Sequence, residues 1–180
     1  MRRYFASLLI CAGALLCAAV AFSENSSAGV TRTSRPVRLL RSWEETIKAT
    51  GGREFARRVD LVIDYSRGIA TEISYTPDGR PYRTREIRQN LPVPSVEEID
   101  EAKQMILADP GLSRIVARFS AVLEGGFVVE EARGLPCGPG SRCLQLQILS
   151  PDRSGLIRWT VVDLARRKIA YPVYMPGGAR

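Results

Sequence analysis

Alternation of apolar and polar residues is the feature that most constrains the fold of this 180-residue chain. A period of two is typical of a strand with one buried face. Five runs show this pattern: residues 59–65, 69–75, 144–148, 157–161 and 169–173. Turn signals such as Pro77-Asp78-Gly79 separate neighbouring runs. The sequence therefore predicts several antiparallel strands.

The first strands are expected to form a meander that follows a short helix. Ser42-Trp43-Glu44-Glu45 has the pattern of a capping box, which predicts a helix from Ser42 to about Ala49, ended by Gly51-Gly52. Trp43 is then expected to anchor this helix on the core. After the strands at 59–75, residues 82–86 form a third strand, and Pro81 marks it as an edge strand.

A second capping box, Ser95-Val96-Glu97-Glu98, opens the best helical pattern in the chain. Its apolar stripe runs at helical spacing to about Asp109, and one further turn is expected at 112–116. The acidic residues near its start favour the positive end of the helix dipole, so we expect them to be solvated. These residues are Glu97, Glu98, Asp100 and Glu101.

A hairpin or meander, a helix and then four strands predict an α+β fold. We expect residues 41–176 to form a single domain, with the short helix and meander at 41–88. Residues 94–176 then form one main helix packed across a four-stranded antiparallel sheet. The pattern leaves two questions open. Gly125-Gly126 is either a bulge or a turn, and the 59–87 meander either joins the later sheet or does not.

The first 23 residues have the pattern of a secretory signal. Arg2 and Arg3 precede an uncharged, largely apolar run that leads to small residues, so cleavage is expected after Ala21 or Ser23. The protein is then periplasmic or secreted, with no membrane attachment. A retained anchor is the alternative, because the run approaches the length of a membrane span. The paired arginines leave general secretion and twin-arginine export both open.

The rest of the chain is basic but not patterned for nucleic acid. The chain has 26 Lys and Arg against 19 Asp and Glu, and most of the arginines are dispersed and lie near acidic residues. We read them as solvated, with a polyanionic partner as the alternative. Residues 24–40 are polar and without period, which predicts a flexible arm.

Two cysteines remain after the predicted signal. Cys137 and Cys143 enclose a Gly- and Pro-containing loop, and an even pair in an exported protein predicts a disulfide. The chain contains no His, which removes Ser-His-Asp triads, Cys-His dyads and His-ligated metals. We therefore expect a protein that is not an enzyme, with no cofactor and no metal.

Residues 94–170 resemble the small, cystatin-like amino-terminal domains of copper amine oxidases. The likeness rests on Glu98-Ile99 and Ala102 in the helix, Arg118-Phe119 after it, and the strand end Val161-Val162-Asp163-Leu164. Gly125 stands where that family usually has Pro after the strand-end Glu. The resemblance implies an antiparallel sheet crossed by one helix, in a peripheral domain that holds neither copper nor the quinone.

The same region also resembles a PepSY domain, an exported module linked to peptidase inhibition. This likeness rests on Ala108-Asp109-Pro110-Gly111, Gly125-Gly126-Phe127 and the ending Lys168-Ile169. It implies a modulator or inhibitor of an exported peptidase.

Our leading interpretation is an exported, non-catalytic accessory module that recognises a protein partner, of undetermined oligomeric state. The peptidase modulator is the alternative. The candidate binding surface combines aromatic rings with arginines, because rings of Tyr bury large area and keep a polar tip. Its residues are Tyr65, Tyr75, Tyr82, Arg83 and Arg85.

Overall fold

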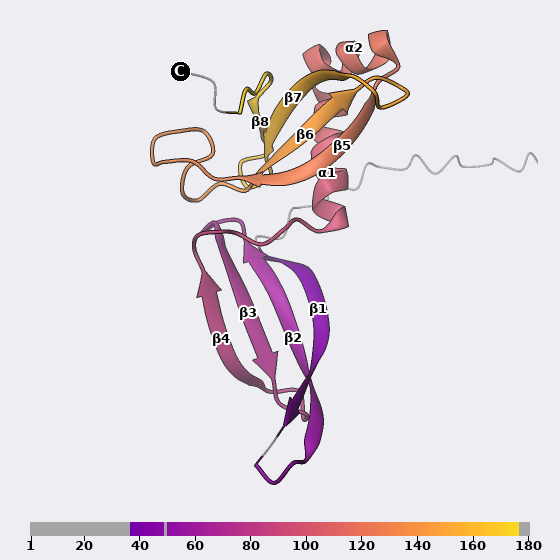
Figure 1. Cartoon of the computed structure of the whole chain (residues 1–180). Helices are drawn as coiled ribbons and strands as arrows, with labels where there is room; N and C mark the ends of the chain where they lie inside the picture. Colours follow the sequence, from indigo (N-terminus) through magenta and orange to yellow (C-terminus); the bar gives the residue numbers. More distant parts are fainter. Residues whose placement is uncertain (1–36, 49, 177–180) are drawn as a thin grey trace, which may run out of the picture. The chain divides into compact units, whose positions relative to one another are not determined.

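The computed structural model describes residues 37–48 and 50–176, which belong to one compact unit of the chain, residues 34–180. The predicted signal at 1–23 and most of the predicted arm lie outside the described residues. Two four-stranded antiparallel sheets and two helices make up the described part, which confirms the α+β class (Figure 1). None of the helices in this part is long and apolar enough to cross a membrane.

The first sheet is an antiparallel meander in the order β1-β2-β3-β4. Its strands are β1 (Val37–Lys48), β2 (Glu54–Asp64), β3 (Ile69–Tyr75) and β4 (Pro81–Ile87). Residues Ser66-Arg67-Gly68 form the turn between β2 and β3, in which the Gly68 amide donates to the Asp64 carbonyl at 2.8 Å. The edge position predicted for the Pro81 strand is also confirmed, because β4 ends the order.

The helix predicted from Ser42 is wrong, because residues 42–48 belong to β1. Trp43, Glu45 and Ile47 are half-buried while their neighbours are exposed, which is the alternation of a strand. Ser42 does not cap a helix; its hydroxyl donates to Asp60 at 2.7 Å. Pairing with β2 along most of the strand outweighs the local capping signal. Residues 37–40 are likewise strand, not arm.

The second helical prediction is confirmed, with one extension. Helix α1 (Val96–Ala108) has the predicted capping box, in which Ser95 and Glu98 satisfy each other's backbone amides. Helix α2 (Pro110–Phe119) is a full helix and not the single turn expected, so the fold has two helices. Asp109 caps α2, and its carboxylate accepts from the amides of Gly111 and Leu112 at 2.9 Å.

The second sheet follows the two helices in the order β5-β6-β7-β8. Its strands are β5 (Val122–Val129), β6 (Cys143–Leu149), β7 (Leu156–Asp163) and β8 (Lys168–Tyr171). The register shifts between Gly125 and Phe127, so these glycines form a bulge and not a turn. The two sheets are separate, and the 59–87 meander does not join the later sheet.

One apolar core joins the two halves of the unit, which are the first sheet (β1–β4) and the region formed by the helices and the second sheet (α1–β8). Ile106 and Ala102 of α1 pack against β6 and against Ile63 and Ala70 of the first sheet, and all are fully buried. From β6 every second side chain enters this core, namely those of Leu144, Leu146 and Ile148. The alternation in the sequence therefore reports the buried face of β6 correctly.

Gly68 of the first sheet's β2–β3 turn lies close to the backbone of Gly140 in the disulfide loop, and this contact yields a prediction. A Cβ on Gly68 would lie 2.5 Å from the Gly140 Cα, and the φ of Gly68 is +62°. We expect Gly68→Ala to lower the free energy of unfolding by about 2–4 kcal/mol, because backbone must shift and a left-handed residue is strained. Denaturant unfolding followed by circular dichroism measures this change.

Gly79→Ala is the matched control for this substitution. Its φ is +82°, and no atom lies within 4 Å of a Cβ built there. It should therefore show only the cost of the left-handed conformation, about 1 kcal/mol. Equal losses in the two variants would contradict a tight contact at Gly68.

Candidate functional site

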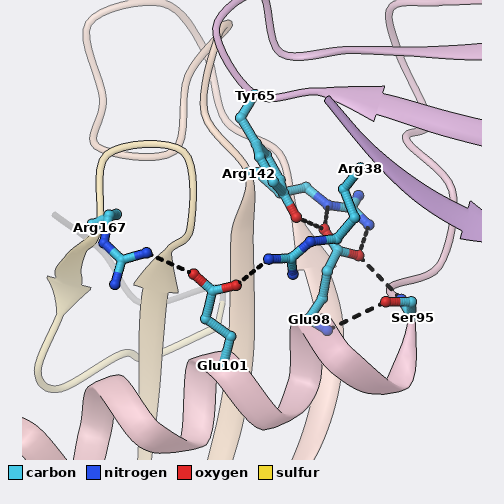
Figure 2. A network of polar contacts seen from close by, with 7 residues as sticks. All are labelled: Arg38, Tyr65, Ser95, Glu98, Glu101, Arg142 and Arg167. Atoms are coloured by element: carbon cyan, nitrogen blue, oxygen red, sulfur yellow. Dashed lines mark hydrogen bonds and ion pairs between the residues drawn. The ribbon is translucent and has the colours of Figure 1, made fainter. Parts of the chain in front are cut away.

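A fully buried ion pair is the centre of the densest polar cluster in the described residues. The Arg142 guanidinium donates from Nε and Nη2 to the two carboxylate oxygens of Glu98, at 2.9 and 2.8 Å (Figure 2). Both side chains have zero exposed fraction. The contact is bidentate, which is the strongest geometry for an arginine and a carboxylate.

Neighbouring groups complete the hydrogen bonding of this pair. The Tyr65 hydroxyl donates to Glu98 at 2.9 Å, and the Ser95 amide donates to the same carboxylate at 3.1 Å. The third nitrogen of the guanidinium, Nη1 of Arg142, donates to the Pro92 carbonyl at 2.9 Å. A buried charge is tolerated only when it is paired and hydrogen-bonded, and here each guanidinium nitrogen and each carboxylate oxygen has a partner.

A second carboxylate on α1 extends the cluster towards solvent. Glu101 accepts from Arg38 of β1 and, at 3.0 Å, from Arg167 of the β7–β8 turn (Figure 2). Glu101 is one-fifth exposed, while Arg167 is half exposed. The cluster therefore links the first sheet, α1, and the strands of the second sheet through charged groups.

Our expectation that Glu98 is solvated is wrong. Its place as the third residue of the helix, where the capping box directs its carboxylate back to Ser95, is readable from sequence. Its partner is not, because Arg142 lies 44 residues away and precedes the Cys143 strand without any distinguishing local pattern. Tyr65 is 33 residues from Glu98, and this separation likewise hides its role.

The predicted binding surface is divided by the structure. Tyr65 is only 8% exposed and belongs to the buried cluster. Tyr75 packs against Arg58, with the guanidinium carbon 4.1 Å from the ring centroid. Tyr82 is 66% exposed and lies near Arg57, whose guanidinium carbon is 5.8 Å from its ring. The five residues do not form one surface.

The register instead brings a different set together on one face of the first sheet. Directly paired residues point to the same face, and the rows are Trp43-Val59-Ser74-Arg83 and Arg41-Leu61-Glu72-Arg85. Arg57 lies in the next row beside Glu45, at 2.7 Å. We name this set the arginine face: Arg41, Trp43, Arg57, Tyr82, Arg83 and Arg85.

The predicted disulfide is confirmed: Cys137 and Cys143 are bonded, with both side chains buried. The loop that it closes lines a hollow of about 540 Å³ together with Arg67 and Arg88. Both of these arginines pair with Glu86, so their charge is partly neutralised.

One curated protein matches most of this chain. It is a 3-methyl-2-oxobutanoate hydroxymethyltransferase from Aeropyrum pernix, 32% identical over 149 residues, which are 77% of this chain and 50% of that protein. The chain thus spans about half the length of this relative, and no family model matches it. Because the relative is named as an enzyme, it contradicts our expectation that the chain is not one, and we withdraw that expectation.

The buried ion pair yields a prediction about stability. Glu98→Gln leaves the Arg142 charge in the interior without its counter-ion, so we expect a loss of about 3–5 kcal/mol in the free energy of unfolding. Adding Arg142→Met to the variant removes the stranded charge and should restore part of this loss. Denaturant unfolding of the parent, of Glu98→Gln and of the double variant measures both the loss and its partial recovery.

Asp78→Asn is the control for a surface ion pair. Asp78 and Arg80 are 60% and 85% exposed, so solvent screens their attraction and the free energy of unfolding should barely change. A loss at Glu98 no larger than the loss at Asp78 would contradict the buried pair.

Tyr65 yields a prediction about alkaline pH. Burial raises the pKa of the Tyr65 hydroxyl above its usual value, and the neighbouring Glu98 carboxylate raises it further. Above about pH 10 the unfolded chain releases this proton while the folded chain keeps it, so the free energy of unfolding falls as pH rises. Unfolding midpoints at about pH 9 and about pH 11 should show this fall.

In Tyr65→Phe the free energy of unfolding should fall less steeply with pH over the same interval, because one proton fewer is released on unfolding. Tyr82→Phe controls for removal of a tyrosine hydroxyl elsewhere and should keep the dependence of the parent. An unchanged dependence in Tyr65→Phe would show that the Tyr65 proton is not held by folding.

Proposed function

We propose that this chain is an exported module that binds a protein partner through the arginine face of the first sheet. The observation that carries the proposal is the alignment of Arg and aromatic side chains in neighbouring rows of β1–β4. Trp, Tyr and Arg are the residue types that supply most binding energy in protein interfaces. A rigid sheet presents them without the cost of ordering a loop.

Access to this face is supported by the exposure of its edge. Six of the seven residues of β4 are exposed, and only Ile87 at its end is half-buried. Helix α1 contacts β5, β6, β7 and β8, and it reaches the first sheet near Arg38 and Tyr65, which are not part of the arginine face. A partner could therefore approach Tyr82, Arg83 and Arg85 without displacing a described element.

The charges indicate a partner that presents carboxylates. The face holds four arginines, and two glutamates pair with them: Glu45 with Arg57, and Glu72 with Arg85 at 2.8 Å. Arg41 and Arg83 have no ion-pair partner among the described residues. Arg41 lies over Trp43, with the guanidinium carbon 5.7 Å from the ring. A carboxylate on the partner would meet these two charges.

Two further points support the wider proposal. In the second half of the unit, one helix lies against four antiparallel strands in sequential order, an arrangement that fits the cystatin-like domain we propose for residues 94–176. The bonded pair Cys137–Cys143 is compatible with an oxidising, extracytoplasmic location.

The test is quantitative capture of a partner from the extracytoplasmic fraction. The immobilised full chain is compared with the variant Arg41→Glu/Arg83→Glu, which reverses the two unpaired charges. We expect the parent to retain a stoichiometric partner and the variant to bind it at least about fivefold more weakly, since each exposed ion pair contributes up to about 1 kcal/mol.

Arg53→Glu/Arg133→Glu is the matched control, because both arginines are exposed and the change in net charge is the same. It should bind the partner like the parent. Recovery of the parent chain alone, or equal binding by the two double variants, would contradict the proposal.

A further inference from the structure

A hollow of about 730 Å³ lies between α2 and the start of β7, away from the arginine face. Three arginines and three apolar side chains line it, together with Gly111: Arg114, Arg118, Arg158, Ile115, Phe119 and Ile157. The cationic and apolar groups come from two elements that are far apart in the sequence. The hollow is open to solvent and is not an enclosed cavity.

None of the three arginines has a carboxylate partner among the described residues. Arg114 donates from Nε to the Pro110 carbonyl of its own helix at 2.9 Å. The Arg118 guanidinium carbon lies 5.3 Å from the Phe119 ring centroid. By contrast, Arg153, just before β7, is paired with Glu124. Unneutralised arginines gathered around one hollow repel each other unless an anion joins them.

The fold explains how these groups converge. Arg114 and Arg118 are four residues apart, so they lie on the same side of α2. Arg158 pairs with Ile148, which is buried in the core, and so it lies on the helix-covered side of the second sheet. Of the apolar residues in the lining, Ile115 and Ile157 are half-buried, and Phe119 is 46% exposed.

We propose that this hollow binds an extended acidic peptide segment in which carboxylates alternate with apolar residues. Side chains four residues apart on a helix are separated by about 6 Å at Cβ. Residues two apart in an extended peptide are separated by about 6.6 Å. Two carboxylates spaced in this way match Arg114 and Arg118, and Arg158 takes a third across the hollow.

The shape of the site favours a peptide over a lipid surface. A bilayer is approached by apolar side chains that protrude from a helix face. Here Ile115 and Ile157 are half-buried against the core, so Phe119 is the one apolar residue of the lining that is exposed to a flat surface. A peptide side chain that enters the hollow can reach all three. The proposal is independent of the arginine face, since the two sets share no residue.

The test measures binding of a fluorescent peptide with glutamate, leucine, glutamate, phenylalanine and glutamate in succession. Anisotropy of this probe with the full chain should rise to saturation, and the affinity should fall as salt is added. Arg114→Glu/Arg118→Glu should weaken binding by about tenfold, because two ion pairs become repulsions. The same peptide with glutamine in place of glutamate should bind the parent chain no more tightly than the glutamate peptide binds the Arg114→Glu/Arg118→Glu variant.

Arg53→Glu/Arg133→Glu is again the control of equal charge change and should bind the probe like the parent. Because the arginine face also carries unpaired charges, Arg114→Glu/Arg118→Glu must weaken binding of the probe more than Arg41→Glu/Arg83→Glu does, which separates this site from the arginine face. Circular dichroism verifies that α2 stays folded; if the reversals unfold it, Arg114→Gln/Arg118→Gln replaces them with the same expected direction.

Three outcomes would overturn the proposal. The glutamine peptide could bind as well as the glutamate peptide, or the control variant could lose as much affinity as the Arg114 and Arg118 variant. Vesicles of phosphatidylglycerol in phosphatidylcholine could bind through these arginines while the peptide does not, which would assign the site to a lipid surface.

Discussion

The ion pair between Glu98 and Arg142 is the contact on which the arrangement of the unit depends. It joins the first turn of α1 to the residue before β6, and Tyr65 adds the end of the first sheet to the same carboxylate. A bidentate charge pair without exposure has few alternative geometries. Its cost in desolvation is offset by hydrogen bonds with three further groups, Tyr65, Ser95 and Pro92, so it specifies how α1 meets both sheets.

The two sheets on either side of this ion pair differ in how much of their surface is exposed to solvent. The second sheet buries one face under the helices, while β4 of the first sheet is exposed along almost its whole length. An exposed sheet is stabilised by pairs between strands, as Arg85 with Glu72 and Arg57 with Glu45 show. The arginines that lack such pairs mark the two surfaces that we propose to bind partners.

The same capping-box pattern occurs twice in the sequence, but it begins a helix at Ser95 and lies within strand β1 at Ser42. The difference comes from contacts with other parts of the fold. Ser42 and Ser95 each precede a Glu by three residues. After Ser95 the apolar residues continue at helical spacing for three turns, whereas after Ser42 only Trp43 and Ile47 do so. A spacing of four residues fits one face of a strand as well as one face of a helix, and pairing with β2 decides for the strand.

Sequence alone determined strands β6, β7 and β8, the edge position of β4, helix α1 with its cap, and the disulfide. All of these follow from residues within one or two turns or strands of each other. Tertiary structure decided that Glu98 is buried, that Tyr65 joins it, and that Arg158 lines the same hollow as Arg114 and Arg118. These contacts span many residues, and local periodicity says which face a side chain occupies but not which distant group it will meet.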